Sequence, residues 1–160
     1  MDWHRLDTQA DLDALMQRCG GFHDGCFREA HVWSETSIAQ DAMTCPLGLD
    51  THVRALFQLA VAKPSAIELR FDQVVRFALS PSDENCDSII SSAAFSLEDG
   101  LFQLKVHLIG LPLKSTPNPG LGVRRGPPES PSIHVAARQA RWRDASEWMG
   151  DPLRYCQEDA

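Results

Sequence analysis

The sequence has no long hydrophobic run. Although 43% of its 160 residues are hydrophobic, none of its segments approaches the roughly 18 uninterrupted apolar residues that a membrane span needs. Its first residues carry acids rather than a basic segment followed by an apolar one, so we expect no secretory signal. These absences exclude a helical membrane protein and predict a cytoplasmic location.

Basic side chains are scarce in the first third of the chain. Residues 1–50 hold three Lys or Arg and nine Asp or Glu, a net charge of −6, while the whole sequence has −7. Such a field repels phosphate backbones, so we expect no nucleic-acid partner. The acidic region would attract a basic protein partner; alternatively, it only keeps the protein soluble.

Cysteine occurs five times, an odd number, and without the CxxC pairs typical of zinc ribbons. We expect free thiols rather than a disulfide framework. The densest group of metal-ligand types is Cys19, His23, Cys26 and His31, but its spacing matches no zinc motif. Since Cys19 lies on an apolar helix face, a small buried side chain explains it better. We therefore expect no metal ion and no cofactor.

Motifs of nucleophilic catalysis and phosphate binding are absent as well. There is no GxSxG, and Gly20-Gly21 precedes a strand rather than a helix. The remaining candidate functional residues are His23 and Asp24. Phosphohydrolases with an HD dipeptide carry it on a helix, whereas here it opens a strand. We therefore interpret Asp24 with Gly25 as a turn in which the carboxylate accepts backbone hydrogen bonds.

The periodicity of apolar residues changes from 3.6 to 2 near Cys26. Before it, Thr8 and Asp11 have the spacing of a capping box, which predicts one amphipathic helix. After it, Asp99-Gly100 predicts a two-residue type I′ turn that opposes Leu97 to Phe102. We expect strands over 26–33, 53–61, 66–79, 89–97, 101–109 and 132–143, with a bend in the third near Asp72-Gln73.

Strands joined by short turns, without helical crossovers, predict an α+β fold. We expect an N-terminal helix followed by a predominantly antiparallel, strongly bent sheet of about six strands, in a single domain 1–160. The segment 111–131 is rich in proline and glycine, which predicts a mobile surface loop. The acidic tail 151–160 is expected to fray.

Three residues are candidates for an interface. Trp33 and Trp142 are expected in the core or over a sheet edge, and either would mark an interface if exposed. Arg141, next to Trp142, would bind an anion or stack on an aromatic ligand; alternatively, it lies on the solvent face of its strand. A single antiparallel sheet has two edges to protect, and for this reason we also expect a homodimer.

Several short motifs in order resemble a group of small uncharacterised bacterial proteins with an F-H-D start and a W-R end. They are Gly21-Phe22-His23-Asp24-Gly25-Cys26-Phe27-Arg28-Glu29, Leu56-Phe57-Gln58, Pro64-Ser65-Ala66-Ile67-Glu68-Leu69 and Arg141-Trp142-Arg143. The F-H-D opening and the strand rhythm are also similar to small immunity proteins of bacterial toxin systems. The resemblance implies a compact α+β protein and identifies no catalytic residue.

Three functions follow as hypotheses. The first is a non-enzymatic, immunity-like protein that binds a protein partner through an acidic sheet face or edge. The second is a metal-assisted hydrolase centred on His23 and Asp24. The third is a structural homo-oligomer.

Overall fold

The structure is a computed structural model that describes residues 2–39, 42–82, 88–109, 132–151 and 153–155. It has one α-helix, α1 (Gln9–Arg18), and two short 3-10 turns, η1 (Gly20–Phe22) and η2 (Ser146–Trp148). The strands are β1 (His4–Leu6), β2 (Cys26–Ser34), β3 (Ser37–Ala39), β4 (Ala42–Thr44), β5 (Thr51–Gln58), β6 (Ala66–Leu79), β7 (Ile89–Glu98), β8 (Leu101–Ile109) and β9 (Ile133–Asp144).

The main sheet has seven strands in the order β1-β9-β6-β5-β2-β7-β8, and its neighbours are antiparallel. A mostly antiparallel sheet with one helix near the N-terminus is therefore confirmed, although one strand of the sheet, β1, precedes the helix. The prediction of about six strands is wrong, because it omits β1. With three residues, β1 is too short to show an alternating pattern in the sequence.

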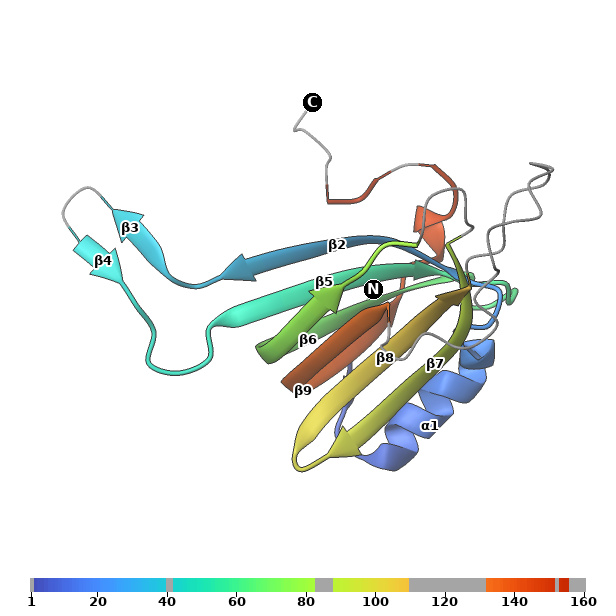
Figure 1. Ribbon diagram of the computed structural model, residues 1–160, viewed down its shortest axis with the longest axis horizontal. Helices are drawn as coiled ribbons and strands as arrows, with labels where there is room; N and C mark the ends of the chain where they lie inside the picture. Colours follow the sequence, from blue (N-terminus) through green and yellow to red (C-terminus); the bar gives the residue numbers. More distant parts are fainter. Residues whose placement is uncertain (1, 40–41, 83–87, 110–131, 152, 156–160) are drawn as a thin grey trace, which may run out of the picture.

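The sheet closes on itself at β9. One edge of β9 pairs with β6, and the other edge pairs first with β8, from Ile133 to Ala137, and then with β1, from Ala140 to Trp142. The seam between β2 and β7 holds one residue pair, Cys26 with Ile89. Helix α1 lies beside β7 (Figure 1). The ring of strands and the helix therefore enclose one core.

Helix α1 begins as the sequence predicts. The Thr8 side chain accepts a hydrogen bond from the Asp11 N–H, and the Asp11 carboxylate accepts one from the Thr8 N–H, so the capping box is complete. The apolar face of the helix buries Leu12 and Leu15. It packs into a core whose largest fully buried side chains include Phe22, Phe57, Phe71, Ile67, Leu69, Ile90, Leu104 and Ile133.

The β7–β8 hairpin has the predicted register, with Leu97 opposite Phe102. Asp99 and Gly100 have φ angles of 51° and 76°, as a type I′ turn requires. Strand β6 bends where Gln73 takes a φ of 56° and the register with β9 shifts between Val74 and Arg76. The bulge bends β6, so that this one strand runs through both halves of the curved sheet.

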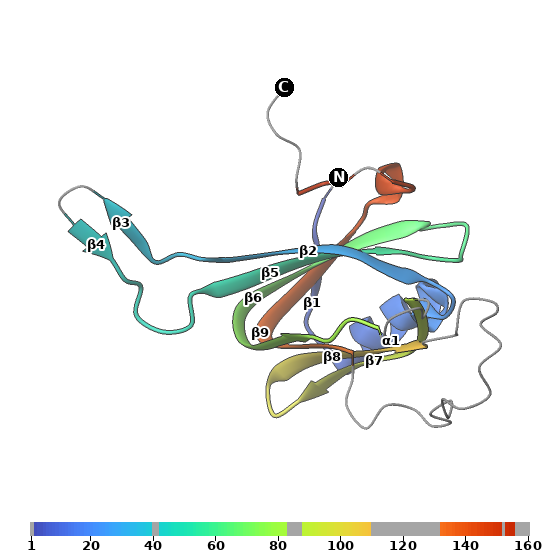
Figure 2. The same cartoon turned by 45° about the horizontal axis from the view of Figure 1, so that its top comes forward.

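A two-stranded arm projects from the body of the protein (Figures 1 and 2). It spans residues 35–50 and contains β3 and β4, which form a separate two-stranded sheet. Its base is closed by the Glu35 N–H, which donates to the Asp50 carbonyl oxygen, and by the Thr36 hydroxyl, which donates to the Asp50 carboxylate.

Two expectations concern segments that the structure covers in part or not at all. The loop 111–131 lies outside the described residues. Of the tail 151–160, residues 151 and 153–155 are described, and Arg154 and Tyr155 are held by hydrogen bonds to Glu29. Within the described ranges, no helix has the length and apolarity to cross a membrane.

Candidate functional site

A row of basic side chains crosses the outer face of the sheet. Each member lies directly opposite the next one in the register of adjacent strands: His31 in β2, Arg54 in β5, Arg70 in β6, Arg141 in β9 and Arg5 in β1. Residues paired in this way point to the same face of a sheet. We call these five residues the arginine row.

Like charges directly opposite one another destabilise a sheet, so the row needs counter-charges. The main one is Asp72, which is only 5% exposed. Arg70 Nε donates to Asp72 Oδ1 over 2.9 Å, and Arg141 Nη2 forms an ion pair with Oδ2 at 3.0 Å. At the end of the row, Arg5 pairs with the exposed Asp7 at 3.0 Å.

Burial by itself would raise the pKa of Asp72. The hydrogen bonds from His52 and Arg70, together with the charges of Arg70 and Arg141, outweigh burial and hold the pKa below the ordinary value of a carboxyl group. Asp72 therefore stays ionised and neutralises about one of its two arginine neighbours.

Arg54, between His31 and Arg70 in the row, has no carboxylate within ion-pair distance among the described residues. Its guanidinium lies over the Trp33 ring, 5.3 Å from the centroid, and Arg70 lies over the same ring at 5.6 Å. Trp33 also stacks on His52, with centroids 5.1 Å apart. This part of the row thus offers a half-buried aromatic platform beside a cation with no fixed counter-ion.

His52 ties the arm to the row. Its Nδ1 lies 2.6 Å from Asp72 Oδ1, and its Nε2 lies 3.0 Å from Oε1 of Glu35, at the base of the arm. An imidazole next to a buried carboxylate resembles half of an acid-base pair. Since both ring nitrogens already contact carboxylates, neither is free to take a proton from a substrate. The geometry favours an orienting role over a catalytic one.

A second buried carboxylate, Glu68, lies on the same face. Arg143 Nε donates to it over 2.5 Å, the Tyr155 hydroxyl over 2.6 Å, and Arg154 Nη2 lies 3.5 Å away. Burial, and then the hydrogen bond to Glu68, raises the pKa of Tyr155, so the phenol stays protonated and donates. The backbone N–H groups of Arg154 and Tyr155 bind Glu29. Residues 153–155 cover this part of the face, and the Tyr155 ring also lies next to His31 at the end of the arginine row, with ring centroids 5.8 Å apart.

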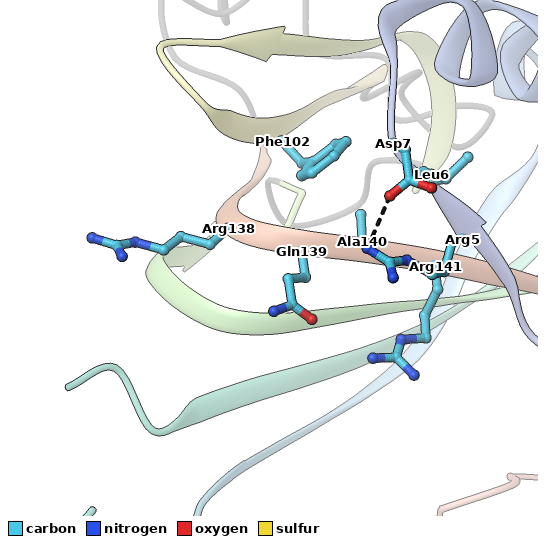
Figure 3. Close-up of a pocket in the computed structure, with 8 residues that line it drawn as sticks. All are labelled: Arg5, Leu6, Asp7, Phe102, Arg138, Gln139, Ala140 and Arg141. Atoms are coloured by element: carbon cyan, nitrogen blue, oxygen red, sulfur yellow. Dashed lines mark ion pairs between the residues drawn. The ribbon is translucent and has the colours of Figure 1, made fainter. Parts of the chain in front are cut away.

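The row ends at a small hollow of about 50 Å³ (Figure 3). The hollow lies where the strand paired with this edge of β9 changes from β1 to β8. This volume has room for only a few water molecules. The lining residues are Arg5, Leu6, Asp7, Phe102, Arg138, Gln139, Ala140 and Arg141. The hollow is too small to enclose an organic ligand, so at this point a partner would contact the row from outside.

His23 and Asp24 lie in the predicted turn before β2, on the surface. Asp24 Oδ2 contacts His23 Nδ1 at 3.0 Å, and both side chains are more than half exposed. The Asp24 N–H donates to the Ile90 carbonyl oxygen, and Asp24 has a φ of 60°. The carboxylate thus contacts His23, rather than the backbone donors that we expected.

The four candidate metal ligands do not converge. Cys19 is buried in the core, and burial raises the pKa of its thiol to about 12. Cys26 is half-buried, whereas His23 and His31 are exposed. Among the residues that the structure describes, no group of three or more His, Cys, Asp or Glu side chains is arranged to hold a metal ion.

The interface candidates separate into two groups. Trp33 and Arg141 belong to the outer face, and Arg141 is a member of the arginine row. Trp142 has the opposite parity and packs partly against the core, where it contacts His4 with ring centroids 5.0 Å apart.

The sequence pattern did not identify His52, Arg54, Arg70 and Asp72 as a group. The available signal was the shared parity of the polar positions 68, 70 and 72 in β6. The missing information was the register between strands far apart in sequence. Comparison of the chain with protein-family models, with curated proteins and with solved structures finds no match.

Proposed function

We propose that the chain is a non-enzymatic binding protein, immunity-like in its role, that recognises a protein partner through the arginine row. The observation that carries this proposal is Arg54, a cation between His31 of β2 and Arg70 of β6 that has no carboxylate partner among the described residues. A partner that brings carboxylates to the row would relieve the like-charge repulsion between its members.

Protein carboxylates suit this surface better than nucleic-acid phosphates do. Each arginine can bind one carboxylate in a bidentate fashion, and Trp33 adds an aromatic surface for the rest of a side chain. A nucleic acid would present a continuous line of phosphates, which a chain of net charge −7 repels. The carboxylates of Glu35, Asp72 and Glu68 lie close to the row and add to this repulsion. From the sequence we expected an acidic sheet face that attracts a basic partner. The proposal is instead that the basic arginine row attracts an acidic segment of the partner.

The test uses a synthetic peptide of ten glutamates and a matched peptide of ten glutamines. Tryptophan fluorescence reports binding, because Trp33 contacts the row. We expect the glutamate peptide to bind at low salt and to weaken as ionic strength rises, and the glutamine peptide not to bind. Binding of a DNA duplex as tight as that of the glutamate peptide would contradict the proposal.

Arg54→Gln is the decisive variant, and Arg76→Gln is its matched control. Arg76 is an exposed arginine of β6 outside the row. We expect Arg54→Gln to weaken binding of the glutamate peptide several-fold and to flatten its salt dependence, while Arg76→Gln binds like the wild type. Equal affinities of the two variants would show that only net charge matters and would overturn the assignment of the site.

A further inference from the structure

The arm exposes apolar side chains on both of its strands and in the segment that returns from β4 to β5. Leu47 is fully exposed, and Ile38 and Met43, which face each other across β3 and β4, are 77% and 64% exposed. An isolated two-stranded hairpin is marginally stable in water. Apolar side chains that gather on a protruding element are typical of an interaction surface. The arm therefore has the character of a segment that another surface covers.

The charge of the arm restricts what that surface can be. Residues 35–50 contain Glu35, Asp41 and Asp50 but no Lys or Arg. A hydrogen bond from the Thr36 hydroxyl lowers the pKa of Asp50, so this carboxylate stays ionised at neutral pH. A surface complementary to the arm is therefore apolar in its lining and cationic at its rim.

The protein itself carries such a surface between β1 and α1. This groove has a volume of about 330 Å³. Its apolar lining consists of Leu6, Ala14, Leu15 and Trp142, and its polar lining consists of His4, the two cations Arg5 and Arg18, and one carboxylate, Asp11. The Arg18 guanidinium lies over the Trp142 ring, 5.5 Å from the centroid.

The groove has a volume that can accept apolar side chains. Its volume equals that of about ten water molecules in the liquid, enough for two aliphatic side chains such as Leu47 and Ile38. Among the described strands, β1 pairs only with β9, so its outer edge offers backbone groups to an added strand. The arm of the same molecule points away from α1 in both views (Figures 1 and 2). The occupant must therefore come from another molecule.

We propose that two copies of the chain form a two-fold dimer in which the arm of each lies in the groove of the other. The reciprocal exchange buries both arms and both grooves and closes the assembly at two copies. It does not depend on recognition of acidic partners by the arginine row, although Arg5 belongs to both surfaces.

Sedimentation at micromolar concentrations measures the assembly. We expect a dimer for the wild type, and for Leu47→Asp a dissociation constant raised at least about tenfold, because a buried leucine is replaced by a charge. Leu79→Asp is the matched control, since Leu79 is an exposed leucine of β6 outside the arm and the groove. A monomeric wild type, or equal effects of the two variants, would overturn the proposal.

A cross-link tests the pairing of arm with groove directly. Cys45 is an exposed free thiol of the arm, and Ala14 is an exposed residue of the groove. With Ala14→Cys, mild oxidation should produce a covalent dimer that disappears when Cys45→Ser is added. A Cys45-dependent dimer of equal yield without the new cysteine would show that the arms meet each other instead. No covalent dimer from a well-folded Ala14→Cys protein would also contradict the exchange.

Discussion

Replacing Asp72 by asparagine should strongly destabilise the protein. The substitution keeps the size of the side chain and one acceptor oxygen, but it removes the charge between Arg70 and Arg141. His52 and Arg70 each donate to this carboxylate, and hydrogen bonds to charged groups contribute about 1.5 to 3 kcal/mol each. Breaking a buried ion pair from one side costs about 3 to 5 kcal/mol.

Partial exposure of the two arginines places the expected loss at the lower end. Their side chains are 26% and 32% exposed, so water can solvate them in part once the carboxylate charge is gone. We expect a loss of about 3 kcal/mol in the free energy of unfolding, which for a chain of this length lowers Tm by roughly 6 to 12 °C. Urea and thermal unfolding measure both quantities.

Asp7→Asn is the matched control, because Asp7 pairs with Arg5 at the surface, where the side chains are 60% and 75% exposed. Such pairs contribute at most about 1 kcal/mol. If Asp72→Asn unfolds within about 1 kcal/mol of the wild type, Asp72 does not stabilise the arginine row and the reasoning is refuted.

The loss should also depend on pH in a definite direction. Since the pKa of Asp72 is lower in the folded state than in the unfolded chain, its charge stabilises the fold fully above the unfolded value of about 3.9. That stabilisation disappears as the pH falls from there through the folded pKa. The difference between wild type and Asp72→Asn should be constant from pH 7 to 5 and should shrink below pH 4. A difference that persists unchanged at pH 3 would contradict this assignment.

Three further changes test local features, each by thermal or urea unfolding. Thr8→Ala removes the side-chain half of the capping box with Asp11 and should cost about 1 kcal/mol, whereas a neutral effect would mean that α1 is fixed by packing alone. Gly25→Ala would place a Cβ 2.8 Å from the Gln58 carbonyl oxygen, so we expect a loss of about 1 to 3 kcal/mol; wild-type stability would contradict this close approach. Asp24→Ala should lose about 1 kcal/mol because of its positive φ, while Asp24→Asn, which tolerates that φ, should match the wild type; equal losses would show that the carboxylate itself is required.

The parts of the fold that local chemistry determines could be predicted from the sequence. The capping box placed the start of α1, and Asp99-Gly100 fixed the register of the β7–β8 hairpin, because both signals act over a few residues. Ring closure could not be predicted, since β8 meets β9 across the segment 110–131, which has no pattern of its own.

The candidate site was missed for a related reason. In the sequence, Glu68, Arg70 and Asp72 alternate with apolar residues and therefore look like a solvent-exposed face. The structure buries Glu68 and Asp72, and their partners come from β5, β6 and β9 and from residues 154–155. Alternation predicts which face a side chain is on, but only tertiary contacts determine whether that face is covered.

The position of β9 has a consequence for how the chain acquires its structure. Among the described residues, this is the last strand along the chain, yet it pairs with β6 on one edge and with β8 and β1 on the other. During synthesis, the edges of β1, β6 and β8 stay unpaired until residues 133–144 have left the ribosome. Pairing of residues so distant in sequence is slow, on a scale of about milliseconds to seconds. Any truncation before Ile133 should therefore yield an aggregation-prone chain instead of a smaller stable fold.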